Sequence, residues 1–247
     1  MILAAGLGTR LRPLTDTVPK PLLHVAGRPI IEYSLLLLRA AGIRDVVINL
    51  HHLGDQIRTR LGDGSAYGLR IVYSMEVAIL DTGGGIKKAE PLLRDAPFVV
   101  LNSDTIMDAP LGELIARHQR EGALATMLLR ADPQAERYGI IRIDDAARIR
   151  SFLGVPPVPA GVSWSPYMFA GLHVFDPRVF TFMPAYRPFS ITRETYPLLI
   201  DRGETVLGIP GQCTWLTVDT PHALMEAEAA ISTGRVHLPY LTQHPTG

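Results

Sequence analysis

The first twenty-one residues combine glycines and cations in a pattern suited to binding phosphate. Gly6 and Gly8 follow a short apolar run, and the cations Arg10, Arg12 and Lys20 come after them. Glycine lets the backbone turn tightly, and N–H groups that converge in a concave loop bind anions. Arginine offers a planar fork to phosphate oxygens, whereas lysine offers a point charge. This segment therefore predicts a loop that grips a polyphosphate.

Two common phosphate-binding loops do not match this segment. The dinucleotide fingerprint needs a third glycine or an alanine where this chain has Leu11. A P-loop needs Gly-Lys and then Ser or Thr after four spacer residues, and the sequence has no such run. The run from Gly6 to Pro21 instead resembles GxGxRxRPLTxxxPKP, the signature of the sugar-phosphate nucleotidyltransferases. The alternative is an ordinary strand-to-helix turn with basic neighbours.

Asp104 follows the apolar run 98–101, at the carboxyl end of an expected strand. Ligands of open α/β sheets bind beyond these ends. A carboxylate there can hold Mg²⁺, which takes one or two carboxylates together with substrate oxygens. The segment also resembles the family's (N/G)xD motif, which implies that Asp104 is a metal ligand. The alternative is a helix cap or an Asx turn, and Asp108 is better placed for the cap.

Three successive glycines, residues 83–85, occupy the middle of the run from Leu80 to Lys88. The run resembles the family's LGTGG-type loop, which packs against the base and ribose and opens a helix. Glycines allow an aromatic ring to lie flat on the backbone and leave the N–H groups at the helix start unobstructed. The alternative is a flexible linker, which is weakened because a helix is expected to begin at Ile86.

The C-terminal motif departs from the family pattern. Relatives usually read Trp-x-Asp-x-Gly-Thr, with the Asp as second metal ligand, but after Trp215 this chain has Thr217 in the place of the acid and Asp219 in the place of the glycine. Residues two apart on a strand face the same side, so Asp219 is a candidate for the missing ligand. The alternative is that Asp219 caps the helix that begins at Pro221, which implies a slow or inactive enzyme.

The sugar-binding side shows a second departure. Relatives often carry Glu-Lys-Pro after a central hairpin, and this chain has no lysine after Phe152. Arg142, Arg148 and Arg150 are alternative sources of charge. The run 169–173 resembles the strand that lines the sugar pocket. Adjacent strand residues point to opposite faces, so we expect a loop role rather than a metal role for the pair His51-His52.

The resemblance implies four groups of site residues and one cofactor. The catalytic residues are Arg10, Lys20 and Asp104. The nucleotide-binding residues are Ala4, Ala5, Gly6, Gly8, Thr9, Arg10, Thr82, Gly83, Gly84 and Asn102. The substrate-binding residues are Gly139, Gly171 and Glu194. The metal ligands are Asp104 and Asp219, and the cofactor is Mg²⁺.

Composition limits the possible partners. The chain has 247 residues, of which 47% are hydrophobic and 19% charged, and its formal net charge is zero. A broad nucleic-acid surface is therefore not expected. The single cysteine, Cys213, forms no intramolecular disulfide, which favours a reducing compartment. The apolar stretch 29–43 contains Glu32 and Arg39, so no membrane span or membrane partner is expected and a cytoplasmic location is predicted.

Apolar strands and helical stretches alternate along the first half, which predicts a largely parallel sheet covered by helices on both faces. The expected strands there are 1–5, 46–48, 69–73 and 98–101, and the expected helices are 29–41, 53–61 and 86–93. The expected later strands are 124–129, 138–143, 148–152, 168–175, 206–209 and 214–218, with helices over 192–202 and 221–232. We expect an α/β chain forming a single Rossmann-like nucleotidyltransferase domain over residues 1–247, with a mixed, mostly parallel central sheet and no C-terminal β-helix domain.

The resemblance implies transfer of NMP from an NTP, with UTP or GTP favoured, to a sugar 1-phosphate. One alternative is a cytidylyltransferase for phosphocholine-like acceptors, favoured by Val218-Asp219-Thr220. An aromatic box for a quaternary ammonium group would support it. Trp164, Tyr167 and Phe169 cluster in the sequence, and the alternative is that they belong to the core. Another alternative is a non-catalytic regulatory protein that binds a nucleotide-sugar. The expected partners are therefore an NTP and a sugar 1-phosphate, and the oligomeric state is left open.

Overall fold

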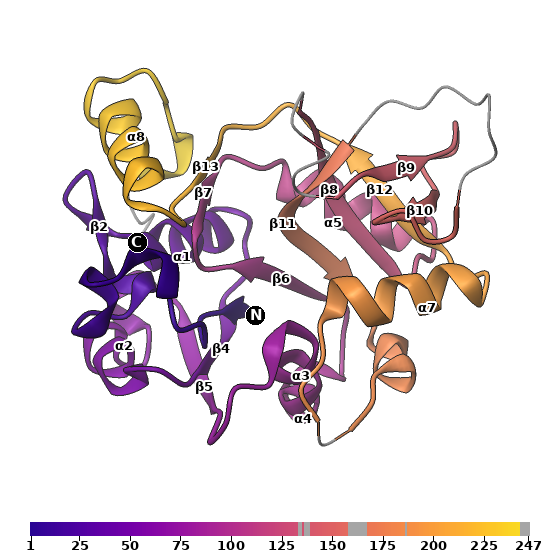
Figure 1. Ribbon diagram of the computed structural model, residues 1–247, viewed down its shortest axis with the longest axis horizontal. Coiled ribbons are helices and arrows are strands. Elements are labelled where there is room, and N and C mark those ends of the chain that lie inside the picture. The colour runs from indigo at the N-terminus through magenta and orange to yellow at the C-terminus, as the bar shows by residue number, and fades with distance from the viewer. Residues whose placement is uncertain (133–134, 136–138, 158–166, 186, 243–247) are drawn as a thin grey trace. The chain divides into compact units, whose positions relative to one another are not determined.

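The computed structural model describes residues 1–247 except 133–134, 136–138, 158–166, 186 and 243–247 (Figure 1). Tyr138 of an expected strand and Trp164 of the possible aromatic box lie outside the described residues. The chain divides into two compact units. Unit 1 consists of Met1–Ile79, Leu101–Ala109 and Cys213–Gly247, and unit 2 consists of Leu80–Val100 and Pro110–Gln212.

Unit 1 is built on parallel strands. They are β1 (Ile2–Leu3), β4 (Asp45–Leu50), β5 (Arg70–Met75) and the last residues of β6 (Phe98–Asn102). Strand β1 pairs with both β4 and β6, and β4 pairs with β5. Leu3 is in register with Asn49 on one side and with Asn102 on the other. Because the strands are parallel, their carboxyl ends meet at one edge, where ligands of such sheets bind.

Three helices accompany this sheet in unit 1: α1 (Ile30–Ala40), α2 (Gly54–Leu61) and α8 (Pro221–Ser232). Helix α1 is buried along almost its whole length, from Ile30 to Leu38. It begins one residue later than expected, because Pro29 is extended and pairs with His24 in the hairpin of β2 (His24–Val25) and β3 (Arg28–Pro29). The sequence did not predict this hairpin.

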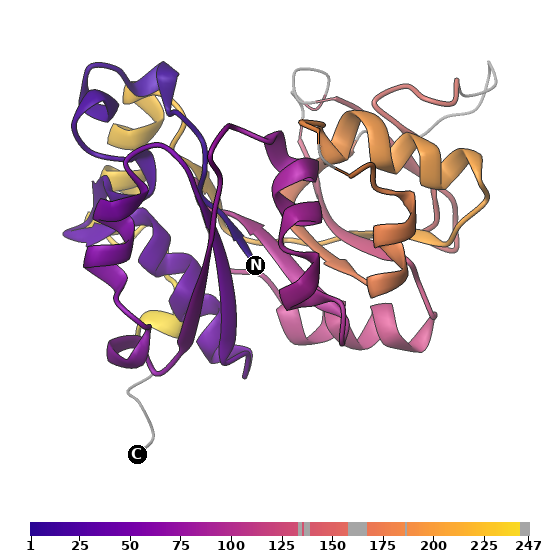
Figure 2. The same cartoon turned by 90° about the horizontal axis from the view of Figure 1, so that it is seen from below.

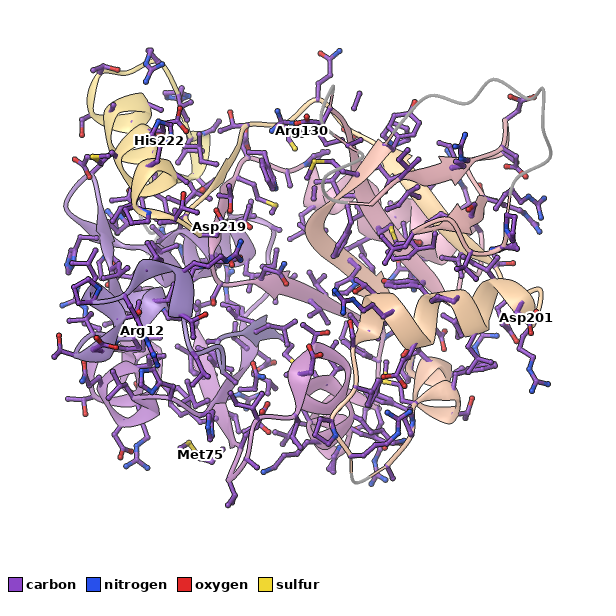
Figure 3. All side chains as sticks on the ribbon, viewed as in Figure 1. Arg12, Met75, Arg130, Asp201, Asp219 and His222 are labelled. Atoms are coloured by element: carbon purple, nitrogen blue, oxygen red, sulfur yellow. The ribbon has the colours of Figure 1, made fainter. Side chains whose placement is uncertain are left out.

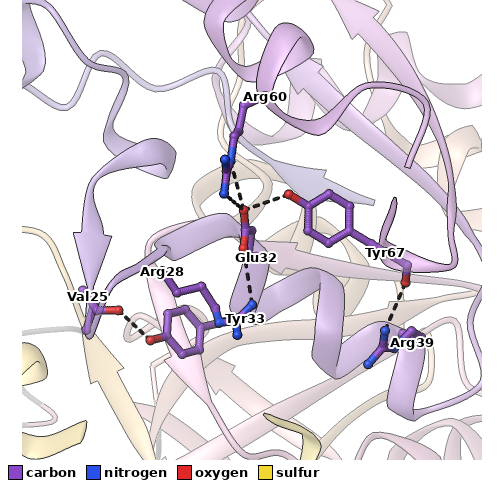
Figure 4. A network of polar contacts seen from close by, with 7 residues as sticks. All are labelled: Val25, Arg28, Glu32, Tyr33, Arg39, Arg60 and Tyr67. Atoms are coloured by element: carbon purple, nitrogen blue, oxygen red, sulfur yellow. Dashed lines mark hydrogen bonds and ion pairs between the residues drawn. The ribbon is translucent and has the colours of Figure 1, made fainter. Parts of the chain in front are cut away.

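A buried carboxylate ties the elements of unit 1 together (Figure 4). Glu32 on α1 accepts hydrogen bonds from Arg60 Nη2 at 2.8 Å and from the Tyr67 hydroxyl at 2.8 Å. Arg28 of β3 lies 3.4 Å from the other oxygen of the same carboxylate. Burial, with the hydrogen bond to Glu32, raises the pKa of Tyr67 to about 12. Glu32 therefore joins α1 to α2, to β3 and to the turn Ser65–Tyr67.

Unit 2 contains a mixed sheet. Its strands are the first residues of β6, then β8 (Ala125–Ala131), β9 (Ile141–Ile143), β10 (Ile149–Phe152), β11 (Tyr167–Phe175) and β12 (Val206–Pro210). Strand β11 pairs antiparallel with β8 and β9, whereas β8 pairs parallel with β12. The accompanying helices are α3 (Asp81–Lys88), α4 (Glu90–Leu93), α5 (Leu111–Arg120) and α7 (Tyr196–Asp201). The core of unit 2 contains stacked rings, including Phe98 on Phe180 and Phe152 on Tyr196.

The α/β class and the mixed, mostly parallel sheet are confirmed. Two local expectations are wrong. Helix α3 begins at Asp81 rather than at Ile86, so the three glycines lie inside a helix. Helix α5 has Pro110 at its N-cap and no side-chain cap, so Asp108 does not cap it. In the part of the chain that the structure describes, no helix is both long enough and apolar enough to cross a membrane.

Candidate functional site

The signature loop, residues 6–21, folds back on itself at Gly8. This residue has a φ of +64°, which glycine adopts without steric cost. A Cβ at this position would lie 2.9 Å from Thr15 Cγ2 and 3.1 Å from Lys20 Cβ. The Thr15 hydroxyl also donates a hydrogen bond to the Gly8 carbonyl at 2.8 Å. The glycine thus allows the two ends of the loop to touch, which brings Lys20 to its start.

Gly6 differs from Gly8, because a Cβ there would meet nothing within 4 Å. Gly6 and Thr9 are exposed, whereas Ala4 and Ala5 are buried. The loop therefore presents its backbone to solvent from Gly6 onward, directly after the buried end of β1. This is the arrangement that the sequence predicts for a loop whose N–H groups receive a phosphate.

Lys20 and Asp104 form an ion pair within unit 1. The distance from Lys20 Nζ to Asp104 Oδ2 is 2.6 Å, and the lysine side chain is only 12% exposed. The Thr105 hydroxyl donates to the other carboxylate oxygen at 3.3 Å. Asp104 is the second residue after β6, so it lies beyond the carboxyl end of that strand, as expected.

Asp219 lies in the C-terminal part of the chain, just before α8 (Figure 3). Strand β13 (Trp215–Thr217) pairs antiparallel with β7 (Thr105–Met107), and Thr217 stands opposite Thr105. One residue further on, the Val218 N–H donates to the Asp104 carbonyl at 2.9 Å. Asp219 then forms an ion pair with Arg10 of the signature loop. The pairing of β7 with β13 therefore places the second acid next to the strand end that carries Asp104.

The alternative that Asp219 caps the last helix is wrong. Helix α8 begins at Pro221, so the capping position belongs to Thr220. The Thr220 hydroxyl accepts the Ala223 N–H at 3.1 Å, as an N-cap side chain does. The carboxylate of Asp219 is thus left to the ion pair with Arg10.

The two ion pairs involve four residues, which we call the charge cluster: Arg10, Lys20, Asp104 and Asp219. Within the described residues, no three His, Cys, Asp or Glu side chains are grouped to hold a metal ion. Two carboxylates nevertheless fit Mg²⁺, which usually keeps waters and completes its shell with substrate oxygens. Arginine and lysine suit the phosphate of the same ligand.

Side chains after β4 hold the signature loop from outside. His52 Nε2 lies 3.0 Å from the Thr15 carbonyl, and the Gln56 side-chain amide donates to the Thr17 carbonyl at 2.9 Å. His51 Nδ1 lies 2.9 Å from the Glu76 carbonyl. The expected loop role of the histidine pair is therefore confirmed. The sequence carried no signal for their partners, which lie 25 to 39 positions away.

Unit 2 carries the second set of candidate nucleotide residues (Figure 2). The Gly83 and Gly84 N–H groups donate to the Phe189 carbonyl at 2.9 and 3.3 Å. The Thr82 hydroxyl accepts the Ile191 N–H at 3.0 Å. The expectation that the helix N–H groups are unobstructed is therefore wrong. The glycines are needed because a Cβ on Gly83 would lie 2.1 Å from Phe189 Cε2.

The candidate sugar residues lie in unit 2 as well. Glu194 forms an ion pair with Arg187 at 2.5 Å. Gly139 has a φ of +92°, and a Cβ on it would lie 2.0 Å from Leu153 Cδ2. Gly171 has a φ of +86°, in a stretch where the register of β11 against β8 shifts. The local backbone conformation thus favours glycine at both positions, which the sequence alone did not reveal.

Of the arginines considered for sugar-phosphate charge, Arg150 is paired with Asp144 at 2.7 Å. Of the two described rings of the possible aromatic box, Phe169 lies 5.0 Å from the ring of His173 in unit 2. This contact offers no separate support for a box around a quaternary ammonium group.

The comparisons with known proteins agree with the signature. A family model described as nucleotidyl transferase matches residues 1–234. The N-acetylmuramate alpha-1-phosphate uridylyltransferase of Neisseria meningitidis serogroup B is 39% identical over 93% of this chain and 96% of its own length. The mannose-1-phosphate guanylyltransferase of Mycobacterium tuberculosis is 34% identical over 99% of this chain and 67% of its own length.

Another relative is longer than the matched region. The UTP–glucose-1-phosphate uridylyltransferase of Synechocystis is 32% identical over 88% of this chain, which spans 59% of that protein. Among solved structures, a putative glucose-1-phosphate thymidylyltransferase from Bacillus anthracis matches with a TM-score of 0.79 and 25% identity, over 92% of each chain.

Proposed function

Because this chain belongs to the nucleotidyl transferase family, we propose that it transfers NMP from an NTP to a sugar 1-phosphate, releasing pyrophosphate and an NDP-sugar. The observation that carries this proposal is the charge cluster, in which the signature loop meets two carboxylates. UTP and GTP are the favoured nucleotides, in line with the names of the uridylyl- and guanylyltransferase relatives. Those names favour this function over the cytidylyltransferase and the non-catalytic alternative.

The reaction asks for positioning and charge neutralisation. An oxygen of the sugar phosphate attacks the α-phosphorus of the NTP, and the bond from that phosphorus to the leaving pyrophosphate oxygen breaks. A phosphate monoester has a second pKa of about 6, so near neutral pH the nucleophile is largely a dianion and needs no general base. The protein contributes by holding the two phosphates in line and by stabilising the charge that develops.

Arg10 and Lys20 would bind the phosphates of the nucleotide, next to the exposed residues Gly6 and Thr9 and the half-buried Gly8. Asp104 and Asp219 would hold Mg²⁺, with Asp219 in place of the acid that Thr217 replaces. Mg²⁺ supplies positive charge against phosphate oxygens when it is bound. In the structure each cation faces one acid. When the ligands bind, the cations would pair with phosphate and the acids with the metal ion instead.

The same proposal assigns roles to further residues. Ala4, Ala5 and Asn102 would line the nucleotide from the carboxyl ends of β1 and β6. The proposed roles in unit 2 are nucleotide binding for Thr82, Gly83 and Gly84 and sugar binding for Gly139, Gly171 and Glu194. The family model spans residues of both units, which supports a single catalytic domain. A cytoplasmic location belongs to the same proposal, since the lone Cys213 suits a reducing compartment.

The first experiment is a pyrophosphate-release assay with Mg²⁺. Four NTPs are each combined with mannose-, glucose-, N-acetylglucosamine- and N-acetylmuramate-1-phosphate and with phosphocholine. Turnover with one combination identifies the base and the acceptor together, and we expect it with UTP or GTP and a sugar phosphate. Turnover only with CTP and phosphocholine would replace the proposal by the cytidylyltransferase.

The same protein also tests the non-catalytic alternative. Calorimetry with UDP- and GDP-sugars measures binding without requiring turnover. Binding of a nucleotide-sugar by folded protein that releases no pyrophosphate from any combination would reject the enzymatic proposal. Omitting Mg²⁺, with EDTA present, tests the metal separately, because full turnover without a divalent ion would contradict the proposed roles of Asp104 and Asp219.

A further inference from the structure

Beyond the roles above, we propose that Asn49 is a positioning residue for the nucleotide-binding backbone, and that Glu76 fixes its orientation. The inference rests on the proposed function, because it assigns to these two side chains the placement of Ala4 and of the loop that follows. Neither residue belongs to the signature motif. Both lie at the carboxyl edge of the sheet in unit 1, at the ends of β4 and β5.

Asn49 extends the hydrogen bonding of β1 by one residue. Leu3, the last residue of β1, is in register with Asn49 of the parallel neighbour. The next residue, Ala4, donates its N–H to Asn49 Oδ1 at 2.9 Å. A side chain thus holds the backbone at the point where β1 ends and the signature loop is about to begin.

Glu76 decides which end of the Asn49 amide faces Ala4. Asn49 Nδ2 donates to Glu76 Oε1 at 2.7 Å, and both side chains are buried. An ionised carboxylate only accepts hydrogen bonds, so the NH₂ end of the amide must face Glu76 and the carbonyl end must face Ala4. Glu76 is fixed in turn, since its N–H donates to the Leu50 carbonyl at 2.7 Å and its carbonyl lies 2.9 Å from His51 Nδ1.

The contacts of Ala4, Asn49 and Glu76 would be an unfavourable way merely to join two strands, because they bury a carboxylate. Burying a carboxylate disfavours the folded state unless hydrogen bonds compensate, whereas apolar side chains join neighbouring strands without that cost. The amide and the carboxylate instead give the Ala4 N–H one defined partner. Errors of about 1 Å in positioning lower reaction rates strongly, so a fixed loop origin is useful where phosphates must be aligned.

Reversing the polarity of the contact provides the test. In Asn49→Asp, Oδ1 still accepts from Ala4, but the second oxygen faces the Glu76 carboxylate. In the double variant Asn49→Asp with Glu76→Gln, the amide introduced by the second substitution donates to that second oxygen, so the same atoms are joined with donor and acceptor exchanged. The measurements are kcat, the KM for the NTP, and the hydrogen exchange of the amides in residues 1–8.

We expect Asn49→Asp to raise the KM for the NTP about tenfold or more, the size of one lost charge-assisted hydrogen bond. We expect a smaller change in kcat and faster exchange at Ala4. In the double variant, the KM for the NTP and the exchange at Ala4 should return most of the way to their wild-type values. Glu76→Gln alone should change the KM less than Asn49→Asp, because its carbonyl oxygen still accepts from Asn49.

Thr126→Val is the matched control, because it removes another buried side-chain hydrogen bond, between Thr126 Oγ1 and His118 Nδ1 at 3.0 Å in unit 2. It should lower the melting temperature and leave the KM unchanged. A wild-type KM in Asn49→Asp, or a loss that the double variant does not repair, overturns the inference. If the unaltered protein releases no pyrophosphate, the proposed function fails, and hydrogen exchange at Ala4 still decides whether Asn49 and Glu76 hold this backbone.

Discussion

At the residue scale, the C-terminal motif departs from the family signature at two positions, Thr217 and Asp219. Thr217 stands where relatives have an acid, and Asp219 follows two positions later. The structure removes the competing role of Asp219, since Thr220 caps α8, and pairs Asp219 with Arg10. Both acids of the charge cluster therefore face cations of the signature loop. This arrangement leads to two predictions about single carboxylates.

Neutralising either acid should stop the reaction. Asp104→Asn and Asp219→Asn should each lower kcat about a hundredfold or more, because the developing charge loses a group that stabilises it in a site of preorganised charges. Mn²⁺ binding followed by electron paramagnetic resonance should weaken in both variants. Asp55→Asn is the control, since Asp55 is an exposed acid paired with Arg58 on α2. Full activity of Asp219→Asn would leave Asp104 as the only proposed metal ligand.

Moving the acid should show whether Asp219 has replaced the family ligand. Thr217→Asp alone should lower activity, because it adds a third carboxylate to two that already share the site. The same change in an Asp219→Gly background restores the family order and should recover activity lost in Asp219→Gly alone. Steady-state rates of the wild type, the two single variants and the double variant give the coupling between positions 217 and 219. Additive effects of the two substitutions would contradict the proposal that Asp219 has taken over the role of an acid at position 217.

At the element scale, apolar runs predicted where most strands lie, because a buried strand needs a continuous apolar sequence. The strands at 46–48 and 98–101 are confirmed within β4 and β6, with bounds that differ by one to two residues. The pair β2–β3 was not predicted, and of the pair β7–β13 only β13 was expected, since strands of two or three residues carry too little periodicity. Their partners are set by tertiary contacts.

The candidate site likewise has parts that the sequence predicted and parts that only tertiary contacts determine. The signature loop and Asp104 follow from a contiguous motif, and so does the position of Asp219. The ion pairs join residues 84 and 209 positions apart, and Asn49 meets Ala4 over 45 positions. Such partners are fixed by the register of β1, β4 and β6 and by the pairing of β7 with β13, which no local pattern reveals. The glycines of α3 were misread because their neighbour Phe189 lies far along the chain.

Packing of α3 explains a testable difference between two helical glycines. Gly83→Ala should destabilise unit 2 by about 1–3 kcal/mol, because the new methyl group overlaps the Phe189 ring. Gly112→Ala in α5 should be neutral or stabilising, since nothing lies within 4 Å of its Cβ position and alanine favours helices. Chemical denaturation measures both changes. Equal effects at the two positions would contradict the close contact between α3 and Phe189.

At the scale of the whole molecule, each unit has its own polar contact inside an apolar core. Unit 1 contains Glu32 with Arg60 and Tyr67, and unit 2 contains His173 with Tyr196. His173 is fully buried, and its Nδ1 lies 2.6 Å from the Tyr196 hydroxyl. Its Nε2 has no hydrogen-bond partner among the described residues. Protonation would therefore add a buried charge and an unpaired donor to unit 2.

Unit 2 should consequently lose stability in acid. Burial lowers the pKa of His173 from its usual 6.5 to about 3. The folded state binds this proton less readily than the unfolded state does. The contribution of neutral His173 to the free energy of unfolding is therefore fully present above pH 6.5 and is lost as the pH falls toward 3. Between these two pKa values, His173 alone changes the free energy of unfolding by up to about 1.4 kcal/mol per pH unit.

Hydrogen exchange at pH 7.5 and pH 5, corrected for the intrinsic rate, separates the units. Amides of β8 and β11 should lose protection at pH 5 more than amides of β4 and β5. His173→Gln removes the titrating group and should reduce this difference, whereas His222→Gln, on the exposed start of α8, should not. The same loss in unit 1 and unit 2, or no effect of His173→Gln, would contradict the role of His173.

Glu32 gives the corresponding prediction for unit 1. Glu32→Ala should lower the free energy of unfolding by about 1–3 kcal/mol, because Tyr67 and two arginines lose their shared acceptor. Glu121→Ala, which removes a partly exposed pair with Arg117 in α5, should change it by less than about 1 kcal/mol. Urea denaturation measures both.

The pairing of β7 with β13 has a consequence for the newly made chain. Unit 1 is assembled from three separate stretches, and the last of them begins at Cys213. While the ribosome is still adding earlier residues, β7 lacks its partner and Arg10 lacks Asp219. A nascent chain already carrying the signature loop and Asp104 thus has only one of the two ion pairs of the charge cluster. The order of synthesis therefore delays completion of the site until the strand from Trp215 to Thr217 has left the exit tunnel.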